Sequence, residues 1–233
     1  MSSDNTRPGY VINANGEPLK ITYAVVNGIA MLEGDIELGT AEEAEEFRRL
    51  IASSGDAATE AIVVKGEKFR WPNGLIPYAI DANLSDQDRV INAIKHWESK
   101  TPLRFPKRTT EADYIYFTVG DGCSSPVGRQ GGQQSIRLAA GCLLGQTIHE
   151  IGHSVGLWHE QSRTDRNQYI EIKWENIIPE TAFNFQQQTS NGEDVGGYDY
   201  GSIMHYGPTA FSKNGLDTIV AKQAGVVIAN APA

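Results

Sequence analysis

The sequence predicts an α+β protein, because strand patterns and helix patterns both occur along its 233 residues. Runs of β-branched and aromatic residues mark the strands, and apolar residues three and four positions apart mark the helices. A third observation is a segment with helical spacing that holds three of the five histidines, between positions 149 and 159. The predicted strands are 19–26, 114–119 and 135–138, and the predicted helices are 40–52, a segment that begins at Ser85, and the histidine-rich segment.

Two of the helix starts are marked by capping residues. Thr40 precedes the first helical segment, and its hydroxyl can accept a hydrogen bond from a backbone N–H of the first turn. Ser85 and Asp88 form a pattern similar to a capping box, so we expect the second helix to begin at Ser85. One side of this second helix carries Val90, Ile91, Ile94 and Trp97.

The histidine-rich segment has the spacing of metal ligands. His149 and His153 are four residues apart, so a helix presents both imidazoles on one face, with Glu150 at the edge of the site. Continuing the helix would turn His159 away, so we expect Gly156 to end the helix in a left-handed conformation. His159 can then complete a set of three imidazoles with an open fourth position, which is typical of catalytic zinc.

This ligand set predicts hydrolytic chemistry. Zinc lowers the pKa of its bound water from 15.7 to roughly 7, which supplies a nucleophile at neutral pH. Glu150 is the natural general base, because it lies beside the ligands and is not needed to bind the metal. A His-Glu-x-x-His pattern alone can also arise by chance on an ordinary helix, so the interpretation depends on the added glycine and third histidine.

Two blocks of sequence resemble a known family. The segment 149–159 matches the extended zinc motif of the metzincin metallopeptidases, and its continuation 160–166 resembles the astacin family within them. The segment 198–207 looks like the astacin Met-turn. The resemblance implies that Met204 lies beneath the metal and that Tyr206 is a switchable zinc ligand whose hydroxyl stabilises the oxyanion. Taken alone, Met204 would be interpreted as core filler and Tyr206 as a half-buried aromatic residue.

The resemblance also implies an architecture. It is an astacin-like catalytic domain with a twisted sheet and long helices above an active-site cleft, and an irregular lower subdomain. Glu160 matches the glutamate that meets the new N-terminus of mature astacins, whereas alone it would be an exposed carboxylate. After residues 211–215, which still resemble the family, the chain shows no sign of the terminal helix that we would expect.

The chain contains two cysteines, Cys123 and Cys142. By themselves they could be free thiols, but they align with one of the two astacin disulfides. The resemblance therefore implies a disulfide between them and an oxidising compartment. The second disulfide of the family has no cysteines here.

The length allows one catalytic domain and an N-terminal extension. Residues 69–78 resemble the start of mature astacin domains, which implies an inhibitory propeptide at 1–61 and a catalytic domain at 62–233, with the boundary between 54 and 65. The extension is also the more acidic part: twelve acidic and six basic residues through Lys68 give −6, and the remaining seventeen and fourteen give −3. The loop-like segment 53–58 suits an activating protease, and we expect cleavage between Ser54 and Val63.

The extension contains the sequence Leu32-Glu33-Gly34-Asp35. It is similar to the Phe-x-Gly-Asp motif of astacin propeptides, although Leu32 replaces the phenylalanine. The resemblance implies that Asp35 binds zinc in the zymogen in place of the catalytic water. Taken alone, the segment would be interpreted as a simple Gly-Asp turn.

Composition narrows the choice of partners and location. A net charge of −9 argues against nucleic acid, and no apolar run approaches the roughly twenty residues of a membrane span. The polar start Met1-Ser2-Ser3-Asp4 is not a signal peptide, so we expect the chain to begin after one that has been removed.

The sequence therefore predicts a secreted, monomeric zinc endopeptidase with one catalytic Zn²⁺, present as a latent precursor and acting on proteins or peptides. A catalytically silent metal-binding relative and a metallohydrolase with a non-peptide substrate are the alternatives. Many astacins prefer an acidic residue just after the scissile bond. Arg129 and Lys213 are candidate basic groups for that pocket, although both could be ordinary surface charges.

Overall fold

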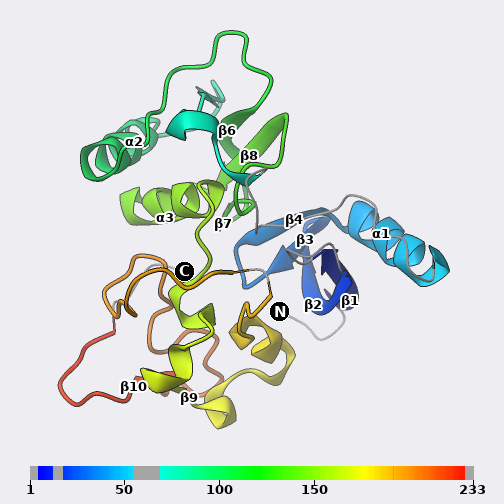
Figure 1. Ribbon diagram of the computed structural model, residues 1–233, viewed down its shortest axis with the longest axis vertical. Helices are drawn as coiled ribbons and strands as arrows, with labels where there is room; N and C mark the ends of the chain where they lie inside the picture. Colours follow the sequence, from blue (N-terminus) through cyan, green and yellow to red (C-terminus); the bar gives the residue numbers. More distant parts are fainter. Residues whose placement is uncertain (1–4, 13–17, 55–68, 191, 229–233) are drawn as a thin grey trace. The chain divides into compact units, whose positions relative to one another are not determined.

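The computed structural model describes residues 5–12, 18–54, 69–190 and 192–228, and the chain forms two compact units. The terminal unit combines residues 1–65 with residues 158–233, and the central unit comprises residues 66–157 (Figure 1). Each unit has its own β-structure and its own buried residues. No helix among the described residues is both long enough and apolar enough to cross a membrane.

The extension folds as a four-stranded antiparallel sheet within the terminal unit (Figure 1). Its strands, in spatial order, are β1 (Thr6–Ile12), β2 (Pro18–Val26), β3 (Ile29–Leu32) and β4 (Ile36–Thr40). The predicted strand 19–26 is confirmed as β2, and the other three strands were not predicted. Asn27 and Gly28 join β2 to β3 with φ values of 49° and 82°, the left-handed pair that favours Asn-Gly in two-residue hairpins.

Helix α1 (Ala41–Ser54) follows β4 directly and packs against the same sheet (Figure 1). Thr40 Oγ1 accepts a hydrogen bond from the Glu43 N–H at 3.1 Å, and the Glu43 carboxylate accepts one from the Thr40 N–H at 2.8 Å. This reciprocal pair is a capping box, so the predicted start at Thr40 is confirmed. The helix ends two residues beyond the predicted end at Ala52.

The rest of the terminal unit is largely irregular. Strands β9 (Ile170–Ile172) and β10 (Ile219–Ala221) form a two-stranded antiparallel sheet, and no helix occurs in the described residues after Ala221. The remaining elements are short 3₁₀ turns at η4 (Glu160–Ser162), η5 (Arg166–Gln168), η6 (Trp174–Asn176) and η7 (Pro179–Phe185). Its apolar core comprises Ile170, Ile172, Ile177, Phe185, Tyr206, Ile219 and Ile228.

The central unit contains a second four-stranded sheet. Its spatial order is β5 (Tyr78–Ile80), β6 (Tyr114–Val119), β8 (Gln133–Leu138) and β7 (Cys123–Ser124), preceded in the chain by the 3₁₀ turn η3 (Pro72–Gly74). The first three strands are parallel, and β7 is antiparallel. The predicted strand 114–119 is confirmed, and the predicted strand 135–138 begins two residues earlier.

Two helices of the central unit pack on each other, α2 (Asp88–Lys100) and α3 (Leu144–Ser154) (Figure 1). The Trp97 indole N–H donates to the Ile148 carbonyl at 3.0 Å. The predicted start of α2 at Ser85 is wrong, and the helix begins at Asp88 without a side-chain cap. Asp86 adopts a φ of 49°, which a right-handed helix cannot include, so the helix starts only after this turn.

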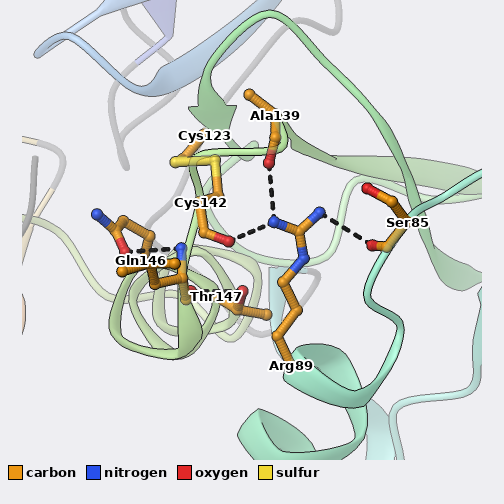
Figure 2. The surroundings of a disulfide bond; sticks show 8 residues. Ser85, Arg89, Cys123, Ala139, Cys142, Gln146 and Thr147 are labelled. Carbon is orange, nitrogen blue, oxygen red and sulfur yellow. Dashed lines mark hydrogen bonds between the residues drawn. A yellow bond between two sulfur atoms is a disulfide. The ribbon is translucent and has the colours of Figure 1, made fainter.

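A disulfide joins Cys123 to Cys142 and leads into the start of α3, as the resemblance implied. Figure 2 shows that the buried Arg89 of α2 points into this corner. Its guanidinium donates hydrogen bonds to the backbone carbonyls of Ala139, Cys142 and Ser85. The Gln146 side chain accepts a hydrogen bond from the Leu143 N–H at 2.9 Å. This bond is one half of a capping box, and the other half cannot form because the leucine side chain has no acceptor. Side-chain bonds therefore fix the N-terminal end of α3.

Gly156 ends α3 as predicted, with a φ of 111°. The Leu157 N–H donates to the Gly152 carbonyl at 2.9 Å and the Gly156 N–H to the His153 carbonyl at 2.8 Å. This pair of bonds is the Schellman motif, which requires a left-handed residue after the last helical turn.

Part of the predicted organisation lies outside the described residues. The boundary between extension and catalytic domain falls there, as do the start at Met1–Asp4 and most of the loop 53–58. The division at residue 61 stays a prediction. The described part of the extension, 5–12 and 18–54, shares one compact unit with residues 158–228.

Replacing both cysteines by serine should lower the free energy of unfolding by about 3 kcal/mol, because the disulfide closes a loop with a sequence separation of 19. Urea unfolding measures the change. The unaltered protein with a reducing agent is the control and should lose the same amount, and a loss below about 1 kcal/mol in both would contradict the prediction.

Replacing Gly156 by alanine should cost about 1–2 kcal/mol, because a side chain disfavours left-handed backbone. A Cβ at Gly156 would meet no atom within 4 Å, so packing adds no cost. Gly141→Ala is the matched control, because that glycine also lies in open space and has no positive φ. Thermal unfolding of the two variants should differ, and equal melting temperatures would show that the helix end does not need a glycine.

Candidate metal centre and active site

The central unit holds three of the predicted site residues on α3. His149, Glu150 and His153 are all buried, and the Nε2 atoms of His149 and His153 lie 3.0 Å apart. The prediction that one helix face presents both imidazoles is therefore confirmed. His153 Nδ1 lies 2.8 Å from the Leu157 carbonyl, which can only accept, so Nδ1 carries the proton and Nε2 presents its lone pair.

The terminal unit holds His159 between two carboxylates. His159 Nδ1 lies 2.7 Å from Glu33 Oε2, and His159 Nε2 lies 3.2 Å from Asp35 Oδ2. The side chains of His159 and Glu33 are almost fully buried, at 0% and 1% exposure, and that of Asp35 is 9% exposed. Burial lowers the pKa of His159, but Asp35 and Glu33 outweigh it and raise the pKa to about 10.

The donor chemistry of zinc ligands is present in both units: at His149 and His153 in the central unit, and at His159 in the terminal unit. Zinc binds the lone pair of neutral imidazole, and a ligating histidine normally donates its other N–H to a carbonyl or a carboxylate. Leu157 O is such a partner for His153, and the Glu33 carboxylate is such a partner for His159. A metal at Nε2 of His159 would take the place of the proton there and would face the Asp35 carboxylate. The residues present therefore fit a zinc ion.

Tyr206 is fully buried, and its hydroxyl donates a hydrogen bond to the backbone carbonyl of Glu33. Its backbone N–H donates to Gln161 Oε1 at 2.9 Å. Burial, followed by the negative charges of Asp35 and Glu33, raises the pKa of the phenol well above its usual value. The side chain is therefore a neutral donor, and in this structure its proton is directed at the extension.

Met204 and Glu160 lie beside each other in the terminal unit. Met204 is buried, and its carbonyl accepts a hydrogen bond from the Glu160 N–H at 2.9 Å. The Glu160 carboxylate is 16% exposed and accepts the Asp199 N–H at 2.9 Å. Burial raises its pKa. Its neighbourhood differs from the freely exposed carboxylate of the alternative interpretation.

His205 contributes to this site although the sequence analysis did not single it out. Its Nδ1 lies 2.7 Å from the Tyr206 carbonyl, and its Nε2 lies 2.7 Å from the Tyr198 hydroxyl. Burial lowers the pKa of His205 to about 4, so it is neutral, with Nδ1–H donating and Nε2 accepting. It links Tyr198 to the backbone of Tyr206. Its place in the Met-turn-like segment was the one available signal.

The candidate specificity residues differ in their surroundings. The Arg129 side chain forms an ion pair with Asp113, with Nε 2.7 Å from Oδ2. Lys213 has an exposed side chain, while its backbone N–H donates to the Asn176 carbonyl at 2.8 Å. The Arg129 charge is therefore already balanced within the central unit.

Comparison with known proteins identifies the family. Residues 63–229 match the family model for the astacin peptidases. The chain is 44% identical over 161 residues to the zinc metalloproteinase nas-6 of Caenorhabditis elegans, a match that covers 67% of this chain and 47% of that protein. It is 38% identical over 195 residues to astacin-like metalloprotease toxin 1 of Loxosceles intermedia, covering 82% of this chain and 69% of the toxin.

A solved structure gives the same result. High choriolytic enzyme 1 of the medaka fish Oryzias latipes, a hatching enzyme zinc-protease, is 39% identical with a TM-score of 0.63, and the match covers 69% of this chain and 84% of that one. The chain spans only 30–41% of the length of four further curated zinc metalloproteinases. The matched segment contains the three histidines, Glu150 and Tyr206, so this chain belongs to the astacin family, whose catalytic metal is zinc.

Proposed function

We propose that the chain is a zinc-dependent endopeptidase in a latent precursor form. The observation that carries this proposal is the chemistry of two residue pairs: His149 with His153 in one unit, and His159 with Asp35 in the other. These four residues offer the ligand atoms that could hold one metal ion. Three neutral imidazoles and one carboxylate are a suitable set for zinc in a precursor.

The residues around the metal have distinct roles in this proposal. His149, His153 and His159 would hold the zinc ion, which when bound would supply an activated water and polarise the substrate carbonyl. Glu150 takes the proton of that water and later gives it to the leaving amine. The Tyr206 hydroxyl donates a hydrogen bond to the oxyanion of the substrate once it has left the Glu33 carbonyl.

Latency follows from what the extension occupies. The turn between β3 and β4 presents the Asp35 carboxylate to Nε2 of His159, and Glu33 engages the Tyr206 hydroxyl. A carboxylate in the fourth position leaves no place for the water that acts as nucleophile. We propose that residues 1–61 are the inhibitory propeptide and 62–233 the catalytic domain.

Activation requires removal of this extension by a protease, with cleavage between Ser54 and Val63. The new N-terminus would then approach Glu160, whose carboxylate accepts a hydrogen bond from Asp199 in this structure. The Glu160 carboxylate already lies 3.7 Å from Arg163 Nε, so an incoming ammonium group would join an existing ion pair.

The remaining parts of the proposal concern substrate and location. The substrates are proteins or peptides, as the names of the metalloproteinase relatives suggest. The Cys123–Cys142 disulfide supports secretion into an oxidising compartment. A monomer remains our expectation. Lys213 is the better candidate for an acidic-residue pocket, because Arg129 is paired with Asp113.

The alternatives differ from this proposal in measurable ways. A silent relative would bind zinc without turnover, and a non-peptide metallohydrolase would not cleave casein. The choice of an endopeptidase rests on the family membership together with an intact Glu150 and Tyr206. Cleavage of casein by the trimmed protein, abolished by a chelator and restored by zinc, separates the three.

In the trimmed protein, Glu150→Gln should lower the turnover rate about 10²–10⁴-fold, because the amide keeps the size of the side chain but cannot accept a proton. Zinc content should be unchanged, since Glu150 is not a proposed ligand. Glu175→Gln, at an exposed site, is the matched control and should keep full activity. A well-folded Glu150→Gln enzyme with substantial turnover would remove Glu150 from the role of base.

In the untrimmed chain, Asp35→Ala should retain zinc on three histidines but open the fourth position to water. We expect measurable peptidase activity before any cleavage, and faster maturation than in the unaltered precursor. Glu46→Ala, an exposed change on α1 of the same extension, should leave the precursor inactive. Equal activity of the Asp35→Ala and Glu46→Ala precursors would mean that latency does not depend on the Asp35 carboxylate.

A further inference from the structure

Glu33 occupies an unusual place in the extension. It is a charged residue with 1% exposure, and it follows β3 in the turn that leads to Asp35. Its φ of 50° lies in the left-handed region, where a residue with a Cβ costs about 1–2 kcal/mol relative to glycine. Burial and strain at one residue require compensation by its contacts.

The compensation comes from three donors on the C-terminal part of the terminal unit. Glu33 Oε2 accepts from His159 Nδ1 at 2.7 Å and from Ser162 Oγ at 3.0 Å. Glu33 Oε1 accepts from Gln188 Nε2. Backbone bonds connect these donors, from the Ser162 N–H to the His159 carbonyl at 3.0 Å and from the Gln188 N–H to the Ser162 carbonyl at 2.7 Å. The Glu33 carboxylate is therefore surrounded by three donors whose backbones are hydrogen-bonded to one another.

We propose that Glu33 is a positioning residue for the metal ligand His159, and that the extension thereby strengthens the zinc site that it blocks. This inference rests on the proposed function. The Glu33 carboxylate holds the proton of His159 on Nδ1, which fixes the ring orientation and presents the Nε2 lone pair to the metal. It also makes the imidazole a more basic ligand.

Charge supports this role. In the zinc-bound chain, the Asp35 and Glu33 carboxylates would bring two negative charges into a buried region, and the three imidazole ligands would bring none. A zinc ion would balance both carboxylates. The buried Arg166 interacts electrostatically with Glu33, and its guanidinium donates a hydrogen bond to the Gln161 carbonyl at 2.8 Å. The precursor should therefore bind zinc more tightly than the trimmed enzyme, which has lost both carboxylates.

Gly34 sets the geometry of the turn that carries these two carboxylates. Its φ is 84°, and a Cβ there would approach the Phe211 ring to 2.9 Å. The turn therefore packs against Phe211. In this one backbone conformation, Glu33 lies at Nδ1 and Asp35 at Nε2 of the same imidazole. Glu33 and Asp35 are two positions apart in sequence, and together they contact both ring nitrogens of His159.

The test uses zinc release from the full-length, uncleaved precursor to a chromogenic chelator. Glu33→Gln keeps the shape and removes the charge. Glu33→Gly removes the side chain and relieves the left-handed strain, so it should fold even if Glu33→Gln does not. Both variants should release zinc about 10–100-fold faster than the unaltered precursor. Loss of a residue that hydrogen-bonds to a metal ligand usually lowers metal affinity by this factor. Glu46→Gln, exposed on α1, should release zinc at the unaltered rate.

Trimming supplies an internal control. Once the extension is removed, every variant yields the same mature sequence. Zinc release and turnover should therefore be identical among the mature products. Each mature product should also release zinc faster than the unaltered precursor does. Unchanged zinc release in both Glu33 variants would overturn the inference while leaving the zinc site and the Asp35 latch intact. Failure of the proposed function would look different, because the trimmed unaltered protein would then not cleave casein, whether or not it binds zinc. A downfield Nδ1 proton of ¹⁵N-labelled His159, lost in Glu33→Gly, gives a second readout independent of activity.

Discussion

The contact on which the candidate metal centre depends is the placement of the His159 imidazole between two buried carboxylates. Asp35 faces Nε2 at 3.2 Å and Glu33 faces Nδ1 at 2.7 Å, and both come from one turn of the extension. A neutral imidazole has one proton and one lone pair, so two ionised carboxylates can both be satisfied only if Nε2 also carries a proton or a metal ion. Nε2 would carry the proton in the metal-free chain and zinc in the metal-bound one. In the function that we propose, inhibition and metal binding use the same side chain.

The central unit contributes rigidity at both ends of its ligand helix. Arg89 and the disulfide fix the chain that enters α3, and the Schellman motif at Gly156 closes it. Burial removes the Arg89 guanidinium from water, and its hydrogen bonds to three backbone carbonyls replace those to solvent. The consequence is that His149 and His153 occupy fixed rotations about one helix axis. Their Nε2 atoms lie 3.0 Å apart because residues four apart share one face of the helix.

The sequence predicts what depends on local spacing, such as the face shared by His149 and His153, the end of α3 at Gly156 and the capping box at Thr40. It fails where the answer depends on distant partners. Glu33 looked like an unspecified motif position, since its partner His159 lies 126 residues away in sequence. The start of α2 was misjudged because a left-handed Asp86 overrides a local capping pattern. Strands β3 and β4 have only four and five residues, and β1 contains Pro8 and Gly9, so alternation alone does not reveal them.

The central claim is that one zinc ion joins the two residue pairs in the uncleaved chain. Its most direct test is a crystal structure of the zinc-loaded, full-length protein, with anomalous diffraction on both sides of the zinc absorption edge. We expect one zinc ion bound by Nε2 of His149, His153 and His159 and by the Asp35 carboxylate, with Glu33 on Nδ1 of His159. A zinc ion whose fourth ligand is water or Tyr206 while Asp35 lies elsewhere, or an ion bound by only one of the two pairs, would contradict it.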